Sequence, residues 1–110
     1  MQKVEVLRNT ILVGYLSKED DGSYKFEYVS EYLADEKPMS ISVNFPINIE
    51  MYRSEFLFPF FYNMLAEGNI KKAQCRSLKI DENDSFSRLI KTSKDDTIGA
   101  VHIGKVVIDE

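Results

Sequence analysis

The segment from Met51 to Leu65 limits the possible folds of this chain more than any other stretch. Four of the seven phenylalanines lie between residues 56 and 61. On a helix, the apolar side chains of this segment point in nearly every direction, and such a helix is buried on several sides. A chain of 110 residues has the length of one domain with one core. The segment therefore predicts either a central core helix or a helix with one face in the core and another face covered by a partner.

The partner alternative has a chemical basis, because aromatic and methionine side chains are enriched at protein interfaces. The loop that follows the predicted helix, at Glu67-Gly68-Asn69, adds polar side chains beside the aromatic ones. We therefore expect a candidate partner-binding surface in this part of the chain. Its residues are Met51, Tyr52, Phe56, Phe58, Tyr62, Glu67 and Asn69.

The predicted helix has recognisable ends. Ser54 can cap its N-terminus, and the helix is expected to run toward Ala66, with Gly68 as its C-terminal stop. Pro59 lies a turn inside this span and removes one backbone donor. We therefore expect an irregular first turn or a helix that starts nearer Phe58.

The first half of the chain alternates apolar and polar residues, as strands do. The clearest case is residues 24–28, where three aromatic residues alternate with two charged ones. Similar patterns predict strands at residues 3–8, 11–16 and 40–45. The first three strands are joined by short connections, so they are expected to form an antiparallel meander. Gly14 marks a bulge or a close approach between backbones.

Other parts of the chain have the pattern of helices. One helical turn is expected at residues 30–34 and a longer helix at residues 70–78. Asp84 is a good cap for a further short helix, whose apolar stripe lies within residues 86–90. Residues 100–108 then form a final pair of strands or one interrupted strand.

These elements predict an α+β fold, with a single domain over residues 1–110. An antiparallel β-sheet is expected from the N-terminal meander, the fourth strand and the C-terminal strand. Two to three helices from the second half of the chain are expected to pack on this sheet.

Composition argues against several classes of function. The net charge is −4 and the pI is about 5.0, which is unlike a domain built to grip phosphate backbones. One cysteine and one histidine cannot build a zinc site, and the five glycines form no phosphate-binding loop. We therefore expect no catalytic residue, no metal and no cofactor. The chain is not expected to be an enzyme or to bind nucleic acid directly.

The sequence also indicates a compartment. Cys75 is the only cysteine, so no disulfide can form within the chain. No apolar run reaches the ~18–20 residues of a membrane span, and Glu5 interrupts what would be the core of a signal peptide. We therefore expect a cytoplasmic protein without membrane contact.

Several short motifs follow one another along nearly the whole chain. They are Val13-Gly14-Tyr15-Leu16; Phe26-Glu27-Tyr28 with Tyr32-Leu33; Pro38-Met39-Ser40-Ile41-Ser42 with Pro46; Phe60-Phe61-Tyr62-Asn63-Met64-Leu65-Ala66-Glu67-Gly68; Asp84-Ser85-Phe86-Ser87-Arg88-Leu89-Ile90; and Asp96-Thr97-Ile98-Gly99-Ala100-Val101. In order and spacing they resemble the N-terminal subdomain of the HipA family of bacterial toxin serine/threonine kinases. One position departs from the family's pattern, because Ala66 stands where the family has proline.

The resemblance implies a role among toxin–antitoxin proteins. In the full-length kinases this subdomain precedes the kinase core, which supplies the ATP site and the catalytic loop. In split systems a free-standing HipS-like antitoxin resembles the subdomain, and it binds and neutralises a short HipA-like kinase toxin. A HipB-like DNA-binding protein is a further partner in a ternary complex. The resemblance thus implies a non-enzymatic antitoxin.

A second interpretation stays open beside the first. The same motifs fit the N-terminal structural module of a longer HipA-type kinase, which contacts the kinase core and the DNA-binding antitoxin. The sequence stops at Glu110, soon after the last motif, and this favours the expectation of an antitoxin without a kinase core.

Overall fold

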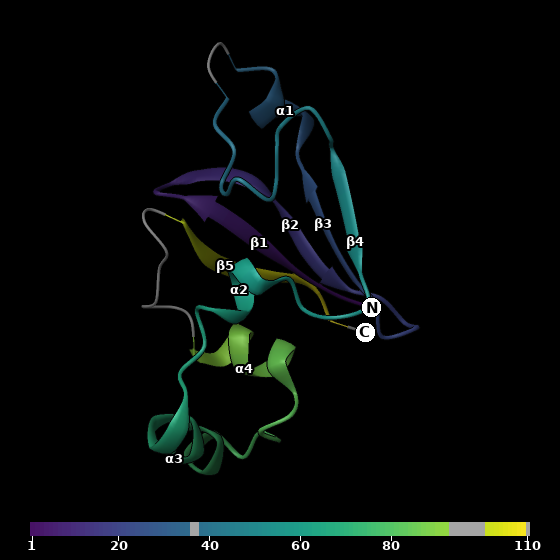
Figure 1. The fold of residues 1–110 in the computed structure, drawn as a ribbon. Coiled ribbons are helices and arrows are strands. Elements are labelled where there is room, and N and C mark those ends of the chain that lie inside the picture. The colour runs from purple at the N-terminus through teal and green to yellow at the C-terminus, as the bar shows by residue number, and fades with distance from the viewer. Residues whose placement is uncertain (36–37, 93–100, 110) are drawn as a thin grey trace.

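A five-stranded antiparallel sheet organises the computed structural model, which describes residues 1–35, 38–92 and 101–109 (Figure 1). The strand order is β4-β3-β2-β1-β5, so β4 and β5 are the two edge strands. The last strand pairs with the first, and the two ends of the chain therefore lie together at one corner of the sheet. The strands are β1 (Gln2–Arg8), β2 (Ile11–Lys18), β3 (Tyr24–Tyr28), β4 (Met51–Ser54) and β5 (Val101–Asp109).

Four helices accompany the sheet in the described part of the chain. They are α1 (Ser30–Leu33), α2 (Pro59–Tyr62), α3 (Gly68–Leu78) and α4 (Ser85–Thr92). Figure 1 shows α2 against the sheet, α4 next to it and α3 at the end of the molecule opposite α1. Within α3 only Cys75 is buried, so this helix adds little to the core.

The core lies on the sheet face that the aromatic residues of β3 share. Tyr24, Phe26 and Tyr28 are all buried, as the alternation predicts. The ring of Phe26 lies 4.9 Å from that of Phe45 and 5.7 Å from that of Phe61, measured between centroids. The loop of residues 38–50 and α2 therefore cover this face of the sheet. The predicted α+β class and the antiparallel meander are confirmed.

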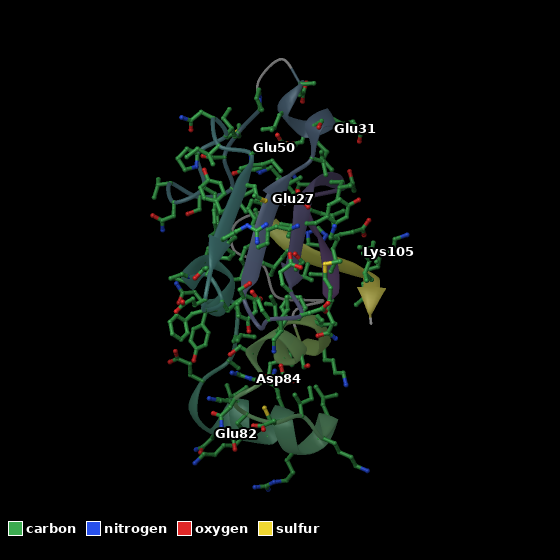
Figure 2. The ribbon with its side chains drawn as sticks, turned by 90° about the vertical axis from the view of Figure 1, so that its right-hand side faces the viewer. Glu27, Glu31, Glu50, Glu82, Asp84 and Lys105 are labelled. Carbon is green, nitrogen blue, oxygen red and sulfur yellow. The ribbon has the colours of Figure 1, made fainter. Side chains whose placement is uncertain are left out.

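The other face of the sheet carries charged side chains in ion pairs. Lys25 lies 3.3 Å from a Glu19 oxygen and 3.8 Å from a Glu27 oxygen, and Lys3 lies 3.7 Å from the same Glu27. Figure 2 shows Glu27 on the sheet face turned toward the viewer. This division into one packed and one solvated face is typical of antiparallel sheets.

The predicted strand at residues 40–45 is wrong. Ile41 and Phe45 are buried there, but Val43 is 90% exposed, and the segment is a series of turns. The backbone groups of this loop bond to a side chain instead of a strand: the Tyr28 hydroxyl donates to the Phe45 carbonyl and accepts from the Ile41 N–H. The fourth strand is instead β4, which pairs with β3 and places Tyr52 opposite Phe26.

The long helix predicted from Ser54 to Ala66 is also wrong in its extent. Ser54 ends β4, and only Pro59–Tyr62 is helical. Pro59 disfavours helical geometry at Phe58, which has φ −56° and ψ 137°, and proline itself suits the first helical position. The expected start nearer Phe58 is therefore confirmed, while the remaining residues form turns.

Gly14 lies at a close approach between backbones, as predicted. A Cβ atom at this position would lie 2.1 Å from the Glu27 carbonyl oxygen. A bulge is present beside it, because Val6 pairs with Gly14 while Leu7 pairs with Leu12. Val13 is the extra residue of this bulge.

The later helices follow the predictions closely. α3 contains the predicted helix of residues 70–78, and the Asp84 carboxylate caps α4 by accepting a 3.1 Å hydrogen bond from the Ser87 N–H. The C-terminal segment differs from its prediction, because it is one continuous strand from Val101 to Asp109 and neither a pair of strands nor an interrupted one. Only its pairing register with β1 shifts, between the partners Ile103 and Val106 and between Val106 and Ile108. The motif at residues 96–101 lies outside the described residues except for its last member.

Candidate partner-binding surface

The aromatic segment divides between core and surface one residue at a time. Phe61 is fully buried, and Leu57 and Phe58 are each 8% exposed. Phe56 is 76% exposed and Tyr62 is 42% exposed. Some side chains of the segment therefore build the core, and others are exposed to solvent.

Phe56 and Tyr62 lie together in one hollow of the surface, which we name the Phe56 hollow. It has a volume of about 340 Å³, and Tyr24 and Leu57 also line it. Its position follows from the end of β4, where the Phe56 N–H donates to the Ser54 hydroxyl at 3.1 Å and the chain turns away from the sheet. Burial raises the pKa of Tyr24 above 10.0, and the negative charge of Asp84 raises it further, so this hydroxyl stays protonated at neutral pH.

A second hollow, which we name the Phe58 hollow, lies beside β4 and has a volume of about 250 Å³. Its aromatic wall is built around Phe45, whose ring lies 5.1 Å from that of Tyr52 and 5.2 Å from that of Phe58, both nearly edge-on. The Tyr52 hydroxyl donates to the Pro46 carbonyl, which holds the ring in place. The residues that line the hollow are Asn44, Phe45, Tyr52, Arg53, Phe58, Pro59 and Phe60.

The structure does not unite all seven residues of the predicted surface. Met51 alternates with Tyr52 along β4, so its half-exposed side chain lies on the solvated face of the sheet. Glu67 and Asn69 are exposed at the start of α3 and line neither hollow. Four of the seven residues thus lie in two aromatic hollows, and the other three, Met51, Glu67 and Asn69, are exposed outside them.

The predicted surface leaves out several residues that line the hollows, among them Phe45, Arg53 and Phe60 in the Phe58 hollow. Phe45 was expected within a strand, and Phe60 was expected within a long helix. Arg53 lies between two predicted residues, and its charge was the only signal that set it apart. Phe45 and Phe60 come together because the loop of residues 38–50 folds back onto the aromatic segment, whereas Arg53 is placed by the pairing of β4 with β3.

The described residues contain no group of three His, Cys, Asp or Glu side chains that could hold a metal ion. The acidic run at residues 81–84 has local structural partners, since the Asp81 carboxylate accepts a 2.8 Å hydrogen bond from the Asn83 N–H. No helix in the described ranges is both long enough and apolar enough to span a membrane.

Comparison with known proteins agrees with this architecture. The sequence profile of the HipA N-terminal domain matches residues 4–104. An uncharacterized protein of Haemophilus influenzae is 32% identical over 88 residues, which covers 80% of this chain and 78% of that protein. The solved N-terminal domain of HipA toxin shares the fold, with a TM-score of 0.71 and 24% identity over 100% of this chain and 96% of that chain. Because the profile spans nearly the whole sequence, this chain belongs to the HipA N-terminal domain family.

Proposed function

We propose that this chain is a non-enzymatic antitoxin that binds and neutralises a HipA-type serine/threonine kinase. Family membership supports an association with components of HipA-type toxin systems. The observation that carries the proposal is the exposed aromatic surface at the Phe56 hollow, in a domain whose aromatic segment otherwise builds the core.

The exposure of Phe56 is energetically unfavourable for an isolated domain. Burying a phenylalanine side chain contributes about 1.5–3 kcal/mol relative to leaving it in water. Phe61, five residues later, is fully buried, so the same segment has access to the core. A partner that covers Phe56 would recover this free energy on binding.

The hollow around Phe56 has the composition of an interface hot spot. Aromatic side chains at the centre of interfaces contribute a large share of binding energy when a rim excludes water from them. Here Tyr24, Phe56 and Tyr62 provide the aromatic centre, and Lys18 and Glu55 provide a charged rim. A complementary apolar surface of the kinase is the partner that this arrangement suits.

Co-expression tests the proposal. A HipA-type kinase from the same genome is produced alone and together with the chain, and growth and co-purification are recorded. We expect the kinase alone to arrest growth, and the chain to restore growth and to co-purify. A kinase that is equally toxic with and without the chain, and that does not co-purify with it, would contradict the proposal.

Two matched variants locate the surface. Phe56→Asp places a charge in the hollow and is expected to abolish both rescue and co-purification, while the melting temperature stays near that of the wild type. Ile11→Asp is the control, because Ile11 is 53% exposed and lies at the opposite end of β2 from Lys18. Ile11 is about 23 Å from Lys18, which lines the Phe56 hollow, at ~3.3 Å per residue of strand. The Ile11 variant is expected to rescue normally.

The structural match favours one alternative function. The solved relative is the N-terminal domain of a toxin, and this chain covers 96% of it. The alternative is therefore a structural module of a longer HipA-type kinase, which contacts the kinase core and the DNA-binding antitoxin. A reading frame that continues into a kinase core after Glu110 would favour this alternative, and a stop codon there would favour the antitoxin.

A further inference from the structure

We propose that the free edge of β4 and the Phe58 hollow together bind an extended segment of a partner protein, which adds a sixth strand to the sheet. The inference rests on the proposed function in one respect, because it requires a protein partner. The bound segment has three residues in a row: one with a carboxylate, then one bulky apolar residue, then a second apolar residue.

The backbone of β4 has unused hydrogen-bonding groups on its outer side. The Tyr28 N–H donates to the Glu50 carbonyl at 2.9 Å, and hydrogen-bonded pairs alternate along an antiparallel ladder. Tyr52 therefore turns its backbone groups toward β3, while Met51 and Arg53 turn theirs away from the sheet. No backbone hydrogen bond on that outward side joins Met51 or Arg53 to any other described residue.

The other edge of the sheet is less suited to an added strand. β5 pairs with β1 through two irregularities of register, one between Lys3 and Val4 and one between Val4 and Val6. Bulges of this kind twist an edge and interrupt pairing. Figure 2 shows Lys105 on β5, at the margin of the sheet opposite β4. The edge at β4 has a regular register over all four residues.

The Phe58 hollow gives the added strand a place for one side chain. Tyr52 points to the packed face of the sheet and lines the hollow. A residue paired opposite Tyr52 on an added strand would point to the same face, because paired residues of neighbouring strands share a face. The volume of about 250 Å³ is below the ~300–1,000 Å³ of small-molecule pockets. The hollow therefore suits a single bulky apolar side chain.

The positive charge of Arg53 favours a carboxylate on the residue next to the bulky apolar one in the added strand. Arg53 is exposed and has no ion pair with any described carboxylate. A residue opposite Arg53 lies on the solvated face of the sheet, where a carboxylate would pair with the guanidinium. Glu50 precedes the strand (Figure 2) and Glu55 follows it in the sequence, so a carboxylate shifted to either end would be repelled. The half-exposed Met51 then favours a second apolar residue opposite it.

A phage-displayed library of random 12-residue peptides, selected on the intact chain, tests the inference. We expect enriched peptides to contain the run of carboxylate, bulky apolar and apolar residues in one direction or the other. In amide NMR spectra, their binding is expected to shift the signals of Met51 and Arg53 most.

Variants of β4 separate strand addition from simple apolar contact. Met51→Pro removes an outward N–H that the sheet itself does not use, and it is expected to weaken peptide binding about five- to tenfold. Met51→Ala keeps that N–H and is expected to bind within about twofold of the wild type. Arg53→Glu is expected to reject acidic peptides by about tenfold and to enrich peptides with lysine or arginine at the same position.

The inference is overturned if no peptide is enriched, or if enriched peptides bind Met51→Pro as tightly as the wild type. If Met51→Pro melts well below the wild type, a peptide N-methylated at the residue facing Met51 replaces that variant, and unchanged affinity for it overturns the inference equally. The outcome is independent of the kinase. Failure of co-purification with normal peptide selection would refute the proposed antitoxin alone.

Discussion

The guanidinium of Arg88 donates a 2.7 Å hydrogen bond to the carbonyl oxygen of Ala66, 22 residues earlier in the chain. Arg88 is 2% exposed and forms no ion pair with a described carboxylate. This bond fastens α4 to the segment that leads from α2 into α3. Ala66 is the position at which the family pattern has proline. The bond can form with either residue, because its acceptor is the backbone carbonyl, which alanine and proline share.

Replacing Arg88 is expected to destabilise the fold strongly. Arg88→Ala would leave a cavity and an unsatisfied carbonyl at Ala66, and should lower the free energy of unfolding by about 2–4 kcal/mol. Urea denaturation followed by circular dichroism measures this loss. Lys91→Ala, at an exposed position of the same helix, is the control and should cost about 0.5 kcal/mol or less. A loss below about 0.5 kcal/mol for Arg88→Ala would contradict the anchoring role.

Gly14→Ala is expected to disrupt the centre of the sheet. The added Cβ would lie 2.1 Å from the Glu27 carbonyl oxygen, so β2 and β3 must separate to accept it. We expect a loss of at least about 3 kcal/mol or failure to fold, measured by thermal and urea unfolding. Gly22→Ala is a control for steric crowding, because no atom lies within 4 Å of a Cβ there. Gly22→Ala is destabilised only by the backbone strain of φ +88°. Equal losses of unfolding free energy in the two variants would argue against a steric clash at Gly14.

The stability of the fold is expected to fall at alkaline pH. Burial raises the pKa of Tyr28 above its usual value of 10.0, and burial also raises the pKa values of Tyr24 and Tyr52. The folded state keeps these protons at a pH at which the unfolded chain has released them. The stabilisation is therefore complete below pH 10 and is lost as pH rises from about 10 through the higher pKa values of the folded state.

Tyr28→Phe provides the control for this pH dependence. At neutral pH the variant should lose about 1–3 kcal/mol, because the Ile41 N–H and the Phe45 carbonyl lose their shared partner. Between pH 10 and 11.5 its stability should fall less steeply than that of the wild type. Urea midpoints at half-unit pH steps measure both effects, and identical slopes would show that Tyr28 does not contribute to the alkaline loss.

The sequence predicted the meander well because local alternation determines it. Residues 24–28 place three aromatic side chains on one face whatever the rest of the chain does, and short turns leave only antiparallel pairing. The cap at Asp84 was equally predictable, since a short polar side chain before an apolar stripe has few other roles.

The strand at residues 40–45 was predicted wrongly because its buried apolar residues belong to a loop and not to an alternating strand. Ile41 and Phe45 are buried because the hydroxyl of Tyr28 binds both of their backbones. No pattern within the segment reveals a partner that lies thirteen residues or more away in the sequence. The side-chain hydroxyl substitutes for the neighbouring strand.

The candidate surface was predictable as a segment but not residue by residue. Phe56 and Phe60 would share a face on a helix, whereas in the structure the residues before Pro59 are not helical, and Phe56 is 76% exposed. The decisive event is the end of β4 at Ser54, which depends on the length of β3. Exposure in this segment is thus a consequence of sheet geometry.

Inhibition of purified kinase tests directly whether this chain neutralises a HipA-type kinase. The kinase is incubated with radiolabelled ATP and a protein substrate, with increasing amounts of the wild-type chain, Phe56→Asp or Ile11→Asp. We expect phosphoryl transfer to fall to background at a stoichiometric amount of the wild type and of Ile11→Asp, and to be unaffected by Phe56→Asp. Phosphoryl transfer that continues at full rate with excess wild-type chain would show that the chain does not neutralise the kinase.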